Sequence, residues 1–281
     1  MSCGLVLEGG ANRGIFTAGV LDFFQQKGLY LPYVIAVSVG SNNAIDYVSK
    51  QIGRTKDCLI PNGRNTPPIH WKHLFRVKSI VNLDLAFDRY PNHLVPFDYQ
   101  TFFDSSIRCE FVATNCITGK AEYLSEKEDK KRLMKICQAS CSMPYLCAVH
   151  DVDDTPYLDG GISDAIPIKR ALEVGMNKCI VVLTREAGFK KPSVSMRHVN
   201  SIMYRDYPNL IYQLNRRTKD YNESISFLSQ LEAMKTVFVV RPTEVLISRT
   251  NNNKKKMGEF YLQGYNVAKS LFSDIKDFVS N

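Results

Sequence analysis

Three short segments, far apart in the chain, carry residue types that could perform chemistry on a bound ligand. The first spans residues 8–14, which read EGGANRG and follow a short apolar run. Glycines let a ligand approach the backbone closely, and the first amides of a following helix have no hydrogen-bond partner within that helix. Such a loop can hold a phosphate, or the oxyanion that develops during acyl transfer. A tight turn between a strand and a helix is the alternative, since the spacing matches neither a dinucleotide-binding loop nor a Walker loop.

The second segment places a serine between small residues. Residues 36–40 read AVSVG and lie at the end of a second apolar run. Small flanking residues let a strand and a helix meet at a sharp turn, a nucleophile elbow, where the serine hydroxyl is exposed to substrate. The pattern normally begins with glycine, and Ala36 adds one methyl group to it. The alternative is that Ser38 simply caps the following helix.

The third segment joins an acid to two glycines. Asp159, Gly160 and Gly161 follow the apolar residues Tyr157 and Leu158, so the carboxylate is expected at a strand end, on a bare backbone turn. A nucleophilic serine needs a base that accepts its proton, and a carboxylate within hydrogen-bond reach can serve as that base. An ordinary Asp-Gly turn is the alternative here.

The elements around these segments alternate between short apolar runs and helical patterns. We expect strands at 4–8, 33–37, 107–114, 120–124, 145–149, 178–183 and 236–240, and helices at about 15–28, 40–50, 130–138, 165–175, 207–234 and 253–277. This alternation predicts an α/β protein with three α/β/α layers and a mainly parallel central sheet that ends in the nucleophile elbow.

One stretch of the chain breaks the alternation. Residues 53–96 are rich in proline and aromatic side chains and show no long periodic apolar pattern that would build a second core. We therefore expect a single domain over residues 1–281 with an insertion at about 53–96. Within the insertion, residues 70–76 (HWKHLFR) are expected to form a packed amphipathic helix; the alternative is contact with a lipid surface.

The composition limits the partners that these segments could serve. The 281 residues are 44% hydrophobic and 23% charged, which excludes collagen-like, disordered and coiled-coil proteins. The net charge of +8 favours an anionic partner such as nucleic acid, an acidic membrane surface or a phosphate-bearing substrate, or else gives a solvated basic surface. Eight cysteines without a Cys-x-x-Cys pair predict a reduced, cytoplasmic protein without a zinc site. Neither a signal peptide nor a membrane span is expected.

Taken together and in this order, the three segments resemble the patatin-like phospholipase family, and in particular its bacterial cytoplasmic members. The family pattern is Asp/Glu-Gly-Gly-Gly-x-Arg-Gly, then Gly-x-Ser-x-Gly, then Asp-Gly-Gly/Ala, which segments 8–14, 36–40 and 159–161 follow. The resemblance covers most of the chain, more loosely between 53 and 96. Ala11 and Ala36 each replace a glycine of the pattern, and neither removes a reacting group or an amide donor. Ala11 would shift the loop if its position required a positive φ.

The resemblance implies a three-layer fold and a serine lipid acyl hydrolase that cleaves carboxylic esters of lipids or phospholipids through a Ser–Asp dyad and an acyl-enzyme intermediate. It implies these roles: Ser38 as nucleophile, Asp159 as base, the amides around Gly9, Gly10 and Ala11 as oxyanion hole, Arg13 as a brace for that loop, Ala36 and Gly40 as parts of the elbow, and Gly160 and Gly161 as the turn. We expect an acyl lipid as substrate and peripheral contact with an anionic membrane surface. No cofactor, metal or nucleic-acid partner is expected.

Three other functions remain open from the residues. Ser38, Asp159 and His198 occur in the chain order of a Ser–Asp–His esterase of the α/β-hydrolase type. Residues 151–155 (DVDDT) are similar to the nucleophile loop of haloacid-dehalogenase-type phosphotransferases, although a solvated hairpin fits their surroundings better. A catalytically weak lipid- or nucleotide-binding protein would use the glycine loop without turnover.

Overall fold

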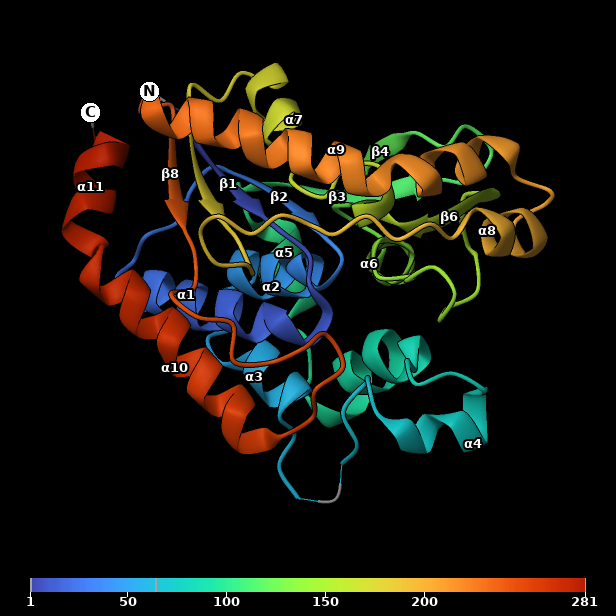
Figure 1. The fold of residues 1–281 in the computed structure, drawn as a ribbon. Coiled ribbons are helices and arrows are strands. Elements are labelled where there is room, and N and C mark those ends of the chain that lie inside the picture. Colours follow the sequence, from blue (N-terminus) through green and yellow to red (C-terminus); the bar gives the residue numbers. More distant parts are fainter. Residues whose placement is uncertain (1, 64, 281) are drawn as a thin grey trace.

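The computed structural model describes residues 2–63 and 65–280, and a mixed β-sheet runs through the middle of the protein (Figure 1). Its strands are β1 (Cys3–Leu7), β2 (Tyr33–Val37), β3 (Arg108–Asn115), β4 (Ala121–Leu124), β5 (His150–Val152), β6 (Thr155–Asp159), β7 (Lys178–Val182) and β8 (Val237–Val240). Their order is β5-β6-β3-β2-β1-β7-β8, and β4 pairs with β3 beside this path. Neighbouring strands along the path β3-β2-β1-β7-β8 are parallel. By contrast, β4 and β6 are antiparallel to β3, and β5 is antiparallel to β6.

Helices cover both faces of this sheet. They are α1 (Gly14–Gln26), α2 (Val39–Val48), α3 (Arg54–Leu59), α4 (Leu74–Val77), α5 (Tyr99–Asp104), α6 (Lys130–Ser140), α7 (Ile168–Glu173), α8 (Arg197–Met203), α9 (Pro208–Ala233), α10 (Lys254–Ser270) and α11 (Phe272–Ser280), with the short 3-10 turns η1 (Ala11–Arg13), η2 (Trp71–His73) and η4 (Gly160–Ile162) and the wider helix η3 (Leu85–Leu94). In Figure 1, α1, α2 and α10 lie on one side of the sheet, and α7 and α9 lie on the other.

The strands are apolar throughout because each face of the sheet has a core of its own. In β1, side chains alternate between the two faces: Leu5 and Leu7 join the core under α1 and α2, and Val6 joins the core under α7 and α9. The parallel strands therefore read as continuous apolar runs in the sequence. The predicted three-layer α/β fold is confirmed.

Outside residues 53–96, two of the expected elements are wrong. Residues 145–149 form a turn instead of a strand, because Tyr145 has φ of 70° and is tied to α8 by bonds from its amide to the Tyr204 hydroxyl and from its hydroxyl to Asn200. The single helix expected at 253–277 is two helices, α10 and α11. The break lets α11 turn toward the sheet, where Phe278 packs on Phe238 of β8 with ring centroids 5.7 Å apart.

The segment 53–96 packs on the helix layer around α1 and α2, where Leu59, Phe87 and other apolar side chains join the main core. Its outer part differs from expectation. The packed amphipathic helix expected at 70–76 is wrong, because η2 and α4 present Trp71, Leu74 and Phe75 at 57%, 49% and 81% exposure. No helix within the described residues is both long and apolar enough to cross a membrane.

Candidate active site

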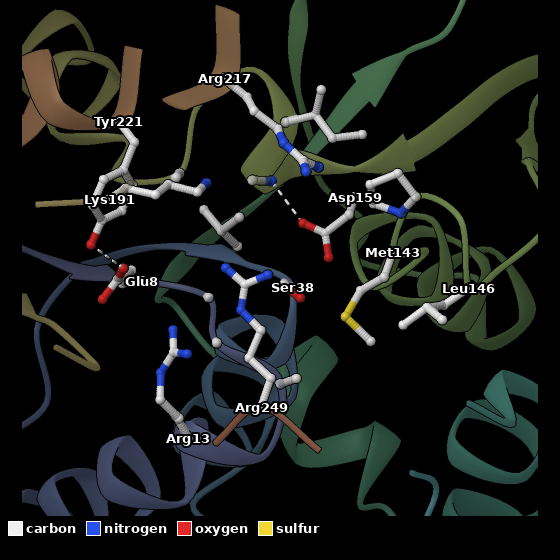
Figure 2. Close-up of a pocket in the computed structure, with 18 of the residues that line it drawn as sticks. Glu8, Arg13, Ser38, Met143, Leu146, Asp159, Lys191, Arg217, Tyr221 and Arg249 are labelled. Carbon is white, nitrogen blue, oxygen red and sulfur yellow. Dashed lines mark hydrogen bonds between the residues drawn. The ribbon is translucent and has the colours of Figure 1, made fainter. Parts of the chain in front are cut away.

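The three segments singled out in the sequence meet at one cavity of about 310 Å³ (Figure 2). The register of the sheet brings the second and third segments together. Val37 of β2 pairs with Val112 of β3, and Asp159 of β6 pairs with Ala113 on the other side of β3. Ser38 and Asp159 therefore lie at the same level of the sheet. The predicted residues that line the cavity are Gly9, Gly10, Ala11, Arg13, Ser38, Asp159 and Gly161. Ala36 and Gly40 lie two positions from Ser38 and Gly160 lies between Asp159 and Gly161; these three residues do not line the cavity.

Ser38 stands on a strained turn between β2 and α2. Its backbone has φ of 56° and ψ of −129°, which is unusual for a residue with a side chain and typical of functional sites. Its hydroxyl does not cap α2, although α2 starts at the next residue. A Cβ at Gly40 would lie 2.9 Å from the carbonyl oxygen of Leu7, so the close approach of helix and strand requires glycine there. This is the geometry of a nucleophile elbow, with the Ala36 methyl fully buried in the core.

The Asp159 carboxyl group lies near the Ser38 side chain in Figure 2 and is almost fully buried. The Gly161 amide donates to its Oδ1 at 2.8 Å. A Cβ at Gly160 would lie 2.2 Å from the carbonyl oxygen of Val112, so only glycine lets the chain turn here. Burial raises the pKa of Asp159; the Ser38 hydroxyl and the Gly161 amide oppose this by stabilising the charged form.

The end of helix α6 holds the backbone of both residues. The Ser38 amide donates to the Ser140 hydroxyl at 3.0 Å, and that hydroxyl donates to the carbonyl oxygen of Val112 at 2.7 Å. The Asp159 amide donates to the carbonyl oxygen of Ser142 at 2.9 Å. Sequence reasoning missed Ser140 and Ser142, because two serines at a helix end form no recognisable motif.

The glycine loop lies directly against Ser38. A Cβ at Gly9 would be 2.9 Å from the Ser38 Cβ. The amides of Gly9, Gly10 and Ala11 donate no hydrogen bond to any residue that the structure describes, which leaves them free for a ligand. Ala11 has φ of 50°, so the position does require the conformation that the glycine of the family pattern supplies, and alanine adopts it. This left-handed conformation costs roughly 1 kcal/mol for a residue with a Cβ.

Arg13 and Glu8 stand behind the loop. The Thr184 amide donates to Glu8 Oε2 at 2.6 Å and the Thr184 hydroxyl donates to the Gly9 carbonyl oxygen at 2.9 Å. Arg13 is buried and its Nη2 donates to the same hydroxyl at 3.5 Å. Burial lowers the pKa of Arg13 to about 10, and the Glu8 carboxylate opposes this shift. The bracing role expected for Arg13 is compatible with this position and stays a prediction.

The other two motifs do not join the cavity. His198 is exposed near the start of α8 and does not line the cavity, so the described residues do not assemble a Ser–Asp–His triad. Residues 151–155 form the hairpin between β5 and β6, in which Asp153 and Asp154 take the turn with φ of 51° and 61°. Asp153 faces solvent and pairs with Arg132. The solvated hairpin is thus the correct interpretation of this segment.

Three cationic residues that line the cavity were not predicted from the sequence. They are Lys191, which follows β7, Arg217 of α9 and Arg249, which follows β8. The chain contains 36 lysines and arginines, and nothing in the sequence distinguishes these three from the others as residues of the site. Only the fold brings these three to Ser38.

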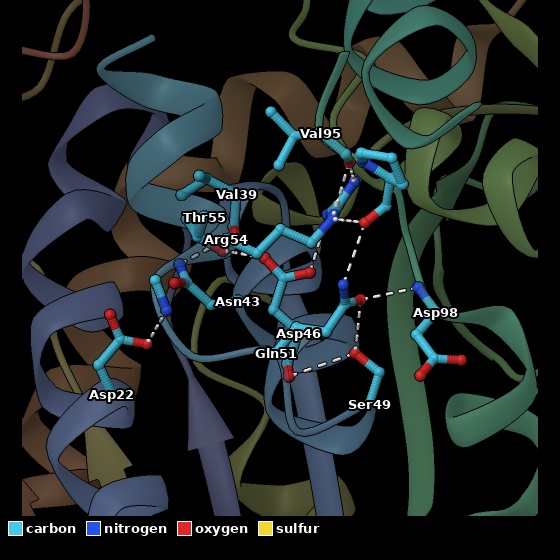
Figure 3. Close-up of polar contacts among 12 residues, drawn as sticks. Asp22, Val39, Asn43, Asp46, Ser49, Gln51, Arg54, Thr55, Val95 and Asp98 are labelled. Atoms are coloured by element: carbon cyan, nitrogen blue, oxygen red, sulfur yellow. Dashed lines mark hydrogen bonds and ion pairs between the residues drawn. The ribbon is translucent and has the colours of Figure 1, made fainter. Parts of the chain in front are cut away.

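A buried ion pair supports the helix that follows Ser38 (Figure 3). Arg54 Nη1 donates to Asp46 Oδ1 of α2 at 2.8 Å, with both side chains less than a tenth exposed. The same guanidinium donates to the carbonyl oxygens of Val95 at 2.9 Å and Pro96 at 3.3 Å. One side chain therefore fastens both ends of the segment 53–96 to α2.

We expect Arg54→Ala to destabilise the protein by about 3–5 kcal/mol, because the Asp46 carboxylate would stay buried without its cation. The free energy of unfolding in urea measures this effect. Lys219→Ala is the matched control: Lys219 pairs with Glu223 on an exposed helix face, and its loss should cost less than about 0.5 kcal/mol. Equal small losses in the two variants would contradict a structural role for the buried pair.

Comparison with known proteins agrees with this geometry. The model of the patatin-like phospholipase family matches residues 5–172, and that of a domain of unknown function (DUF6363) matches residues 207–280. The uncharacterized protein YjjU of Escherichia coli (strain K12) is 29% identical over 187 residues, which are 64% of this chain and 51% of YjjU. The chain thus spans about half the length of this curated relative.

A likeness of fold extends over nearly the whole chain. The crystal structure of VipD from Legionella pneumophila matches with a TM-score of 0.53 and 14% sequence identity, over 97% of this chain and 67% of VipD. A match at 14% sequence identity is evidence for a shared fold alone. The family model covers more than half of the chain and includes all three segments of the cavity. The chain belongs to the patatin-like phospholipase family.

Proposed function

We propose that the protein is a serine hydrolase of lipid carboxylic esters, with Ser38 as nucleophile and Asp159 as base. Membership of the family supports lipid hydrolase activity in general. The observation that carries the finer proposal is the pairing of a strained, elbow-borne serine with a buried carboxylate of raised pKa in one cavity. A raised pKa suits a carboxylate that must accept a proton from a hydroxyl.

The proposed cycle has two steps. Asp159 accepts the Ser38 proton as Oγ attacks the ester carbonyl, and the amides of Gly9, Gly10 and Ala11 donate to the developing oxyanion. The intermediate collapses, the C–O bond to the leaving alcohol breaks, and Asp159 returns the proton to that alcohol. Water then attacks the acyl-serine with Asp159 as base again, which releases the fatty acid and restores Ser38. Loss of one oxyanion donor typically raises such a barrier by about 3 kcal/mol.

Covalent labelling tests the nucleophile directly. A fluorophosphonate probe should label the wild-type protein at Ser38 and fail to label Ser38→Ala. Absence of labelling in the wild type, together with binding of lipid, would favour a binding protein that uses the glycine loop without turnover. A panel of p-nitrophenyl esters and defined phospholipids, with and without chelator, then gives the range of esters cleaved.

The exposed apolar residues of η2 and α4 support contact with an anionic lipid surface. Trp71 and Phe75 lie close together, with ring centroids 6.0 Å apart, and the same segment carries the exposed Lys72 and Lys78. Aromatic side chains are favoured at the membrane interface, and nearby lysines are attracted to anionic headgroups. The segment adjoins the cavity, because the Ser79 hydroxyl donates to the carbonyl oxygen of Leu146, which lines it. A lipid surface held there would be next to the proposed catalytic residues.

Removing the two rings should weaken binding to vesicles. We expect the double variant Trp71→Ala/Phe75→Ala to bind phosphatidylglycerol vesicles at least about tenfold more weakly, since each ring contributes apolar area to the interface. Co-sedimentation measures the loss. Leu262→Ala, which removes an exposed apolar side chain from α10, is the control and should bind as the wild type does. Unchanged binding by the double variant would contradict the proposed contact.

A further inference from the structure

Three cationic side chains from widely separated segments converge on the cavity that holds Ser38. Lys191, Arg217 and Arg249 come from the loop after β7, from α9 and from the loop after β8, and all three line the cavity. Figure 2 shows them arranged around Ser38. In total, four cationic side chains line the cavity against two carboxylates. The proposed reaction uses none of the three, so their convergence calls for another explanation.

These cations have no acid to pair with in the part of the chain that the structure describes. Neither the ammonium of Lys191 nor the guanidinium groups of Arg217 and Arg249 form an ion pair there. The Glu8 carboxylate of the same cavity accepts hydrogen bonds from the Thr184 amide at 2.6 Å and the Tyr221 hydroxyl at 2.9 Å, and forms no ion pair with these cations. The three cations therefore form no ion pair among the described residues, and cationic side chains outnumber carboxylates in the lining of the cavity.

The like charges are held together against their repulsion. Burial, together with the charges of Arg249 and Arg217, lowers the pKa of Lys191 to about 8. In addition, the Nε of Arg13 is buried and has no hydrogen-bond partner among the described residues. A bound anion would relieve the repulsion and supply acceptors for these donors, and planar guanidinium groups suit phosphate oxygens well.

The cavity has unlike walls on the two sides of Ser38. Met143 and Leu146 provide an apolar wall, and Lys191 lies on the opposite side in Figure 2. An amphipathic molecule with its ester at Ser38 would lay its acyl chain against the first wall and its polar headgroup against the second. The Leu146 carbonyl oxygen also accepts a hydrogen bond from Ser79, which follows α4, so the acyl chain would lie on the side of the proposed lipid contact.

We propose that Lys191, Arg217 and Arg249 form a subsite for the phosphate group of the lipid substrate, next to the ester that Ser38 attacks. The inference rests on the proposed function and deepens it by naming the headgroup. The subsite favours an unsubstituted phosphate over phosphocholine. A quaternary ammonium needs a free aromatic face or an unpaired carboxylate, but the rings of Tyr145 and Tyr221 already face Arg217 and Lys191, at 5.5 and 5.1 Å.

The test compares three substrates with the same acyl chain: 1-acylglycerol 3-phosphate, 1-acylglycerophosphocholine and 1-acylglycerol. The wild-type protein should show a kcat/KM at least about tenfold higher for the phosphomonoester than for the other two. Arg217→Gln should reduce this preference by about 10–100-fold, mainly through KM, because a hydrogen-bonded charge on the phosphate is lost. Lys191→Gln should act in the same direction, and Arg217→Lys should restore part of the preference.

A matched control lies one residue away on α9. Arg216 does not line the cavity and pairs with Asp220 at 3.2 Å, so Arg216→Gln should keep the preference. Inorganic phosphate should inhibit the wild-type protein more strongly than Arg217→Gln. Phosphate inhibition without a preference for the phosphate-bearing lipid would assign the cations to free phosphate and overturn the headgroup subsite. Equal kcat/KM for all three lipids would overturn the subsite and leave the hydrolase standing, whereas no hydrolysis of any of them would overturn both.

Discussion

Ser38→Ala is expected to lower kcat for ester hydrolysis by about 10⁴-fold or more, the scale seen when a hydrolase loses its nucleophile. Alanine keeps the Cβ that packs beside Gly9 and removes only the hydroxyl that attacks the carbonyl. The fold should therefore persist, with a free energy of unfolding within about 1 kcal/mol of the wild type. Steady-state kinetics with a p-nitrophenyl ester and urea unfolding of the same preparations measure the two effects.

The control for this variant is His198→Ala. Because His198 is exposed and does not line the cavity, its loss should leave kcat unchanged. A large loss of activity in His198→Ala would instead support a Ser–Asp–His triad formed after a rearrangement of α8. Near-normal turnover by Ser38→Ala would remove this serine from the mechanism altogether.

Asp159→Asn should lower kcat by about 10³–10⁴-fold, because the amide cannot accept the Ser38 proton. In the wild-type protein the base must be ionised. Activity should therefore rise with pH through the pKa of Asp159 and then level off, and burial places that rise above the usual range for an aspartate. A pH–rate profile of kcat/KM measures the position of the rise.

The same substitution should affect stability in the opposite direction to activity. A carboxyl group whose pKa is raised by folding stabilises the fold while it is protonated, below its unfolded pKa. That contribution is lost as pH rises through the folded pKa. Above the folded pKa the ionised, buried Asp159 therefore costs stability, and there Asp159→Asn should melt at the same temperature as the wild type or higher. A lower melting temperature of Asp159→Asn on the plateau of the pH–rate profile would contradict the desolvation of this carboxylate.

The chemical segments could be predicted from sequence because each is local. A nucleophile elbow, a glycine loop and an Asp-Gly-Gly turn each use neighbouring residues to force one backbone shape. The strand order and register of the mixed sheet then bring the three segments together. Lys191, Arg217 and Arg249 belong to no such pattern. They meet Ser38 through helix packing and loop paths between residues 150 or more positions apart, which the periodicity of one sequence does not encode.

The errors in the expected elements have a similar cause. The apolar run 145–149 has the composition of a strand, but hydrogen bonds from Tyr145 to α8 hold it as a turn at the cavity wall. The aromatic residues of 70–76 fit a buried amphipathic helix as well as an exposed one. In each case the local pattern allowed two outcomes, and contacts made by distant residues decided between them.

The two hydrogen bonds from the end of α6 have a mechanical consequence. They hold the chain at Ser38 and at Asp159 from points only two residues apart, Ser140 at the last position of α6 and Ser142 just beyond it. A small displacement of that terminus carries the attacking oxygen and its proton acceptor in the same direction. We therefore expect their mutual spacing to vary less than the width of the cavity, whose walls come from several separate segments of the chain.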